Sequence, residues 1–290
     1  MILRPCDVLF ECKNNNLHTH ISKDAEPAIH TRLSIVKSFF HQAILESSVN
    51  NFSFVLNLSD LCYDDNIYSL PYLCLTKKKN HDHILIPSID FFSGLIFSVL
   101  KQSNDQIVFN DKRDGSIFIG SPTNPIRLKY CSFMHGQDQH LAFLTNVDKK
   151  YLDIHQHQFP LIHKYIINPI SICDQLKNKI VVNIDGNAMC WSRLYWQMNS
   201  NSIPVYISKN QDYEQYFDRF NDDGCYFNAD LDNYLDIYNY ILDENNRSQV
   251  DIINNNGMAY CKNTFGEYMN NPKIYLLKII HSVIEKVYNE

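Results

Sequence analysis

Two arginines follow glycine-containing turns in the middle part of the chain. Gly120 and Ser121 begin one turn, and Arg127 follows in the next predicted helix. Gly186 stands in the other turn and precedes Arg193. Exposed amides and the positive end of a helix favour an anion, and an arginine adds a bidentate donor. Two such turns side by side can hold a diphosphate. The alternative is an ordinary turn and a surface ion pair.

The second turn carries further polar side chains. Asp185 and Asn187 flank its glycine, and Ser192 opens a predicted helix over residues 192–198. The glycines, helix ends and arginines make the two turns candidates for a phosphate site. Neither turn matches a Walker loop or a GxGxxG fingerprint, and the missing fingerprint disfavours an unrelated dinucleotide-binding oxidoreductase.

Asp60 is the candidate general base. It follows, with Ser59, the run Phe52–Leu58, whose aromatic and branched residues predict a strand. A carboxylate at the end of a strand can take a proton from a hydroxyl. The alternative is an acid that only shapes a turn or caps a helix.

No pattern predicts a metal site. Histidines occur in close pairs, such as His81 and His83, without an acid or cysteine at metal-ligand spacing. Asp230 and Asp232 spell the Asp-x-Asp of metal-dependent sugar transferases. A match of this length is common by chance, so we expect no metal and keep this pair as an alternative.

Alternating strands and helices must position these residues. Predicted strands over residues 116–119, 180–184 and 203–207 are followed by predicted helices, which implies a parallel sheet with helices on its faces. In such sheets ligands bind beyond the carboxyl ends of the strands. These ends carry Gly120 and the turn 185–187.

Local patterns predict the remaining elements. We expect irregular structure over residues 1–30, a helix from Thr31 to about Glu46, a helix over 91–100, a linker or domain boundary over 101–115, a strand over 151–154 and a helical turn over 213–217. A closing helix over 272–288 has an apolar stripe, which predicts packing on the body of the protein. Because lysines flank the stripe, contact with a membrane surface is the alternative.

Composition excludes several classes of protein. The net charge of -6 disfavours a nucleic-acid binder. The sequence has no run of about 18 apolar residues, so we expect no transmembrane helix. Nine scattered cysteines contain no Cys-x-x-Cys pair, and the N-terminus lacks the pattern of a signal peptide. We therefore expect a cytoplasmic protein, with peripheral contact to the inner face of a membrane as the alternative.

Four segments resemble, in the same order, the CAP10-like glycosyltransferases of family 90. The resemblance extends over roughly residues 50–220. The segments are Phe54–Asp60, His83–Pro87, Phe118–Arg127 and residues 179–194, followed by a Tyr-x-Glu-like turn at Tyr213–Phe217.

The resemblance implies a GT-B-like α/β fold, in which two Rossmann-like halves face each other across a cleft. Residues 1–100 would form the acceptor-side half, 101–265 the nucleotide-sugar half, and 266–290 a C-terminal helix packed on the body. The implied reaction is inverting transfer from a UDP-sugar to a hydroxyl of a glycan, such as lipopolysaccharide, or of a protein. Asp60 would be the base, without a metal or another cofactor. The implied donor-binding residues are Gly120, Ser121, Arg127, Asp185, Gly186, Asn187, Ser192, Arg193 and Glu214.

Two positions depart from the family pattern. Ile119 and Pro122 stand where the family usually has basic residues. Fewer phosphate contacts would follow, so a non-catalytic protein that binds a nucleotide sugar or a glycan is the main alternative.

Overall fold

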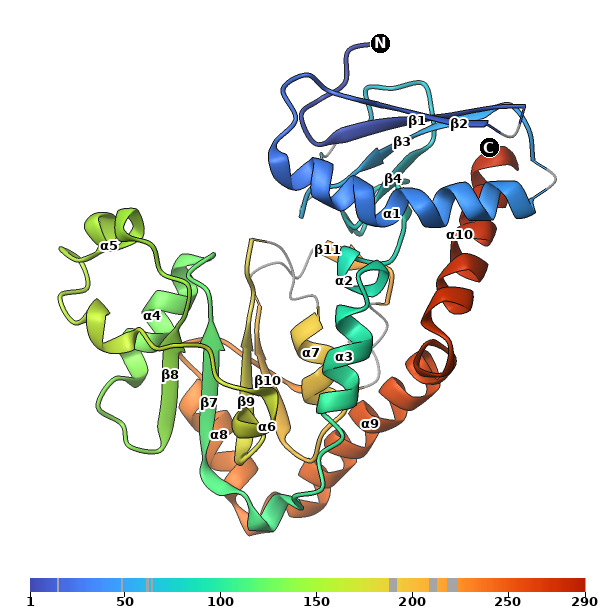
Figure 1. The fold of residues 1–290 in the computed structure, drawn as a ribbon. Helices are drawn as coiled ribbons and strands as arrows, with labels where there is room; N and C mark the ends of the chain where they lie inside the picture. The colour runs from blue at the N-terminus through green and yellow to red at the C-terminus, as the bar shows by residue number, and fades with distance from the viewer. Residues whose placement is uncertain are drawn as a thin grey trace. The chain divides into compact units, whose positions relative to one another are not determined.

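The computed structural model describes residues 1–14, 16–47, 49–60, 63, 65–187, 192–208, 213–217 and 224–289 (Figure 1). The chain forms two compact units. The first unit contains Met1–Phe97, the described residues 213–217 and the C-terminal stretch from Phe265. The second unit contains the described parts of residues 98–208 and 224–264. The protein is thus a mixed α/β chain, and each unit has its own sheet.

The sheet of the first unit is mixed. Its strand order is β2-β1-β3-β4-β6, in which β1 is antiparallel to β2 and β3, while β3, β4 and β6 are parallel. The strands are β1 (Asp7–Lys13), β2 (Asn16–Ile21), β3 (Phe52–Asn57), β4 (Tyr72–Cys74) and β6 (Ile84–Leu85). The expectation of an irregular N-terminus is wrong. Val8, Phe10 and Cys12 alternate into the core, as a strand with one buried face requires.

Helices and aromatic side chains complete the first unit. α1 (Pro27–Glu46) begins earlier than expected, at a proline that fits the first helical position. Its Phe40 ring lies 5.2 Å from that of Phe10, which stacks at 4.9 Å on Phe54. α10 (Pro272–Asn289) packs on α1 and buries Leu276, Leu277, Ile280, Val283, Ile284 and Val287.

Three short elements differ from expectation in this part of the chain. The segment 91–100 is two helices, α2 (Ile89–Phe92) and α3 (Leu95–Gln102), because Gly94 has a positive φ of 77°. β5 (Thr76–Lys78) pairs antiparallel with β11 (Tyr213–Gln215). Residues 213–215 therefore form a strand and not the expected helical turn.

The sheet of the second unit is wholly parallel. It contains β7 (Arg113–Gly120), β8 (His140–Leu144), β9 (Asn178–Ile184), β10 (Ile203–Ile207) and β12 (Phe227–Ala229). The spatial order is β12-β10-β9-β7-β8. Numbered along the chain, this is the doubly wound order 2-1-3-4-5. The expected alternation of strands and helices around a parallel sheet is confirmed.

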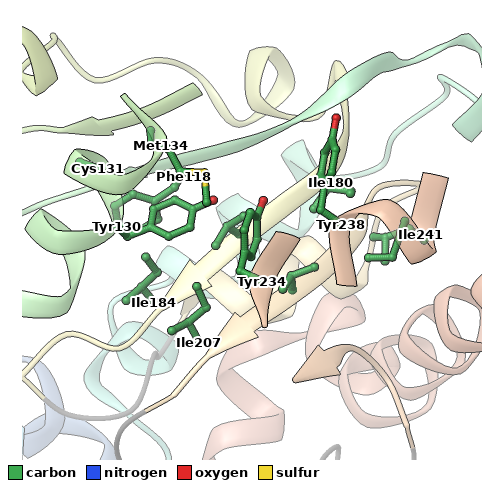
Figure 2. Close-up of a cluster of buried hydrophobic side chains, with 14 of the residues drawn as sticks. Phe118, Tyr130, Cys131, Met134, Ile180, Ile184, Ile207, Tyr234, Tyr238 and Ile241 are labelled. Atoms are coloured by element: carbon green, nitrogen blue, oxygen red, sulfur yellow. The ribbon is translucent and has the colours of Figure 1, made fainter. Parts of the chain in front are cut away.

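Helices cover both faces of this sheet (Figure 1). On one face, α4 (Pro125–Met134) and α8 (Tyr234–Leu242) enclose a core that includes Phe118, Tyr130 and Tyr234 (Figure 2). On the other face, Trp196 of α7 (Ser192–Met198) packs with Ile119. The remaining helices are α5 (Lys149–His155), α6 (Ile172–Gln175) and α9 (Arg247–Asn270).

Residues 151–154, expected as a strand, lie within α5. The carboxylate of Asp148 caps this helix by accepting a hydrogen bond from the Tyr151 amide over 2.7 Å.

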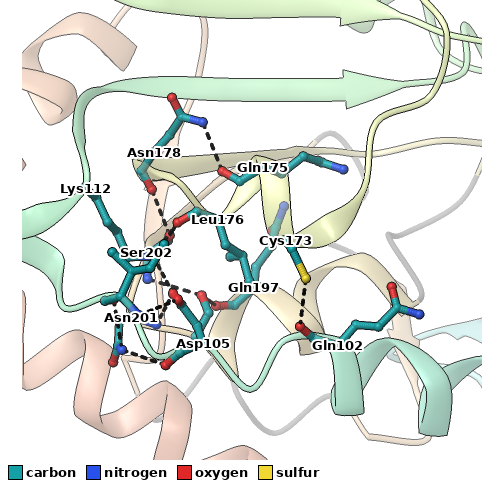
Figure 3. A network of polar contacts seen from close by, with 12 residues as sticks. Gln102, Asp105, Lys112, Cys173, Gln175, Leu176, Asn178, Gln197, Asn201 and Ser202 are labelled. Atoms are coloured by element: carbon teal, nitrogen blue, oxygen red, sulfur yellow. Dashed lines mark hydrogen bonds and ion pairs between the residues drawn. The ribbon is translucent and has the colours of Figure 1, made fainter.

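A buried ion pair anchors the segment before β7 (Figure 3). The ammonium of Lys112 donates to the carboxylate of Asp105 and to the carbonyl of Leu176. Both charged side chains are almost fully buried. Asn201 adds hydrogen bonds to the carbonyls of Asp105 and Ile107, at 3.0 and 3.1 Å. The polar stretch expected as a linker is therefore fastened to the second unit.

Across the residues described, no helix combines the length and apolar character that crossing a bilayer requires.

Candidate functional site

The candidate site lies at the carboxyl edge of the parallel sheet, between β7 and β9. From β7 the chain passes through α4 to β8, whereas from β9 it passes through α7 to β10 on the other side. The order of strands reverses here, and ligands of doubly wound sheets bind at such a point. The turns after both strands touch. The Asn124 side chain donates to the carbonyl of Gly186 over 3.1 Å.

Arg127, in the first turn of α4, connects the two turns. Its guanidinium donates to the carbonyls of Ser121 over 2.7 Å, Ile184 over 2.7 Å and Asp185 over 2.9 Å. The residue is 8% exposed. Since these donors are directed at backbone oxygens, Arg127 shapes the turns that the sequence predicts as a phosphate site.

Arg193 approaches the same place from the opposite face of the sheet. It lies in the first turn of α7, is half-buried and donates from Nη1 to the carbonyl of Ile119. Its guanidinium carbon lies 5.6 Å from the ring centre of Phe118, and that of Arg127 lies 5.9 Å from it. Two positive charges therefore flank one aromatic ring at the carboxyl edge.

Glycine permits the close approach of the turns. A Cβ at Gly186 would lie 3.1 Å from Oγ1 of Thr123 and 3.2 Å from Nη2 of Arg127. A Cβ at Gly120 would lie 2.9 Å from the ring of Phe118. The backbone at both turns thus runs where any larger residue would displace a neighbour.

Asp185 is a buried carboxylate with two hydroxyl partners. Oδ1 accepts from the Tyr206 hydroxyl over 2.5 Å, and Oδ2 accepts from the Ser208 hydroxyl over 2.9 Å. This side chain, predicted to contact the donor, connects the ends of β9 and β10 instead of facing solvent. Asn187 is exposed and Ser192 half-buried at the same edge, while residues 188–191 of the motif lie outside the described residues.

The sequence reasoning missed two asparagines at this edge. The side chain of Asn124 accepts from the Ile126 amide over 3.0 Å, so it caps α4. Asn146 donates to the Ser121 hydroxyl over 3.3 Å and has a positive φ of 54°. Both carry a readable signal, because Asn before Pro favours a helix cap and asparagine tolerates the left-handed conformation.

Asp60, the expected base, belongs to the first unit. Its Oδ1 accepts from Nη2 of Arg32 over 2.6 Å, and Nη1 of the same arginine donates to the Leu58 carbonyl over 2.5 Å. The carboxylate side chain is 30% exposed. The Asp60 side chain is partly accessible to solvent. Its Oδ1, however, is already paired with Arg32.

Glu214, expected to contact the donor, also belongs to the first unit. It lies in β11, and its carboxylate pairs with Lys77 of β5 over 3.1 Å. The structure therefore brings Gly120, Ser121, Arg127, Asp185, Gly186 and Arg193 together within the second unit, whereas Asp60 and Glu214 are held by cations of the first.

The Asp-x-Asp pattern lies in a turn before α8. Oδ1 of Asp230 accepts from the amides of Asp232 and Asn233, both at 2.9 Å. Among the described residues, no three His, Cys, Asp or Glu side chains lie close enough together to hold a metal ion. Asp230 thus orders the entry to α8.

No protein-family model and no curated protein sequence matches the chain. The resemblance to the CAP10-like glycosyltransferases therefore stays a prediction from its four segments.

Proposed function

We propose that the protein is an inverting glycosyltransferase that moves a sugar from a UDP-sugar to a hydroxyl of a glycan or protein acceptor. One observation carries the proposal: two glycine turns and two arginines converge at the switch point of the doubly wound sheet. In this proposal the second unit binds the donor, the first unit serves the acceptor, and together they are the halves of a GT-B-like enzyme.

The charges at the switch point suit a departing diphosphate. UDP gains negative charge as the glycosidic bond breaks, and positive groups held in advance stabilise that charge. Arg193 approaches from α7, and the amino end of α4 adds its dipole. Arg127 contributes its charge while its donors hold the turns. With these groups present, we propose that the reaction does not depend on a metal.

Asp60 has the remaining role. In an inverting transfer the acceptor oxygen attacks the anomeric carbon, and a base takes the proton of the hydroxyl. We assign this role to Asp60, with Arg32 as the residue that positions it through the 2.6 Å contact.

A second candidate is a non-catalytic protein that binds a nucleotide sugar or a glycan. The Arg32–Asp60 pair favours it, because an ion-paired oxygen is less available to a substrate proton. The hydrogen bonds of Arg127 to backbone carbonyls also favour the non-catalytic candidate, because they occupy donors that a diphosphate would need.

The proposal is tested by thermal unfolding with UDP and a panel of UDP-sugars, in the presence of EDTA. A ligand that binds only the folded state stabilises it by about 4 kcal/mol at a thousandfold excess over Kd. We expect a rise in Tm that Arg193→Ala abolishes. Arg113→Ala is the control, because Arg113 is exposed at the opposite end of β7.

No rise in Tm with UDP or any UDP-sugar overturns the transferase and the binding of these nucleotide sugars, and leaves only a glycan-binding protein. A rise without release of UDP from any UDP-sugar, in the presence of mixed acceptor sugars, favours the non-catalytic candidate.

A further inference from the structure

A pocket of about 570 Å³ opens in the first unit, beside the amino ends of β4 and β6. Its volume falls in the range of small-molecule sites, about 300–1,000 Å³. Two buried rings lie in its wall, those of Tyr72 and His83. Exposed polar side chains, among them Asn80 and Asp82, complete it. None of the residues proposed to bind the donor lines this pocket.

Hydrogen-bonding side chains dominate the lining, and no lysine or arginine is among its described residues. Asn66, Ser69, Asn80 and His81 can each donate and accept, and Asp82 can accept. The nearby ammonium of Lys77 donates to the His81 carbonyl over 2.7 Å and pairs with Glu214. An anionic ligand would therefore meet the Asp82 carboxylate and no lining lysine or arginine, whereas sugar hydroxyls, which also donate and accept, match this set.

The two buried rings are held rigidly. Nε2 of His83 donates to the Tyr63 carbonyl over 3.1 Å, and its ring meets that of Tyr72 edge-on at 4.9 Å. Burial lowers the pKa of His83 and so favours the neutral form of its ring. The Tyr72 hydroxyl donates to Oδ1 of the buried Asp7 over 2.7 Å. A wall fixed in this way loses little entropy when a ligand binds.

We propose that this pocket binds a neutral saccharide, with Asn80, His81 and Asp82 as its hydrogen-bonding partners. Apolar surface from Leu70 and Pro71 is available to the C–H faces of the sugar ring. If the protein is the proposed transferase, the bound saccharide is part of the acceptor, and this assignment alone rests on the proposed function. Binding of the free sugar does not depend on a nucleotide.

The test is saturation-transfer NMR on the full chain without nucleotide. The probes are glucose, galactose, mannose and N-acetylglucosamine at millimolar concentration. We expect transfer to at least one sugar, with at least a fivefold loss in the double variant Asn80→Ala/Asp82→Ala. The control Asp24→Ala/Asn50→Ala changes two exposed residues of the same types in the first unit and retains the signal.

A second variant guards against misfolding. Ser69→Trp places a bulky ring on an exposed position of the lining, and we expect it to block the sugar while Tm stays near that of the wild type. Absence of transfer to every sugar, or an unchanged signal in both pocket variants, overturns the proposal. Sugar binding without any effect of UDP would support the sugar pocket and overturn the proposed transferase. An effect of UDP without sugar binding would support the transferase and overturn the sugar pocket.

Discussion

Arg127 donates a hydrogen bond from Nε to the backbone carbonyl of Asp185, over 2.9 Å and across 58 residues of sequence. The same guanidinium reaches the carbonyl of Ser121, so one side chain from α4 holds the turns after β7 and β9 together. An arginine that the sequence offers as a ligand for phosphate is thus also the structural connection of the candidate site.

Arg127→Lys is expected to lower the free energy of unfolding by about 2–3 kcal/mol. A single ammonium cannot reproduce a planar fork that serves three carbonyls, and buried acceptors would lose charged hydrogen bonds. Urea unfolding measures the loss, with Arg113→Lys as the control, because Arg113 is exposed at the start of β7. A variant as stable as the wild type that binds UDP more weakly would contradict this role and make Arg127 a direct ligand.

Asp60→Asn is expected to lower the rate of sugar transfer by about 10²–10⁴-fold, the usual contribution of a general base. The amide keeps the size of the carboxylate but cannot take the proton. UDP should still raise Tm, because the proposed donor residues belong to the second unit. The measurement is UDP release from the UDP-sugar panel.

Asp65→Asn is the control for Asp60, because this exposed aspartate of the same unit also pairs with an arginine, Arg4, over 3.0 Å. Full transfer activity in Asp60→Asn would refute the assignment of the base.

Several elements of the fold could be predicted from the sequence, and the failures have physical causes. Runs such as Ile203–Ile207, buried on both faces, read directly as central strands of a parallel sheet. The short apolar run within 151–154 fits a helix or a strand equally well, and the cap at Asp148 decides for the helix. At the N-terminus the alternation through Val8 and Phe10 was readable, but the polar residues that follow obscured it.

The location of the candidate site could be predicted more easily than its contacts. Gly120 and Gly186 follow strands of one sheet, and carboxyl ends of parallel strands share an edge. The partners of Arg127 depend on β7 lying beside β9 in the sheet. The ion pair of Asp60 with Arg32 joins α1 to the segment after β3, 28 residues further along the chain. Neither contact leaves a local pattern in the sequence.

Asp105→Asn is expected to lower the free energy of unfolding by about 3–5 kcal/mol at pH 7, because it leaves the buried Lys112 ammonium without its carboxylate. Burial already lowers the pKa of Lys112 from 10.5, and loss of Asp105 lowers it further. Between the lowered pKa and 10.5 the unfolded chain then binds more protons than the folded one. Stability of the variant should therefore rise with pH from the lowered pKa towards 10.5.

Urea unfolding between pH 7 and 10 measures this recovery. Asp174→Asn is the control, since Asp174 and its partner Lys177 are both exposed. A loss that does not depend on pH would argue against a buried charge as the cause.

Gly186→Ala is expected to weaken UDP binding and to lower the free energy of unfolding by about 1–3 kcal/mol, as overpacking usually does. The added methyl would lie 3.1 Å from Oγ1 of Thr123 and 3.2 Å from Nη2 of Arg127, so these two side chains must shift to admit it. Gly266→Ala is the matched control. Its Cβ meets nothing within 4 Å and it lies inside α9, where alanine should stabilise by about 0.5–1 kcal/mol. Thermal unfolding with and without UDP compares them. Equal Tm values and equal UDP shifts in the two variants would show that the close approach at Gly186 has no bearing on the site.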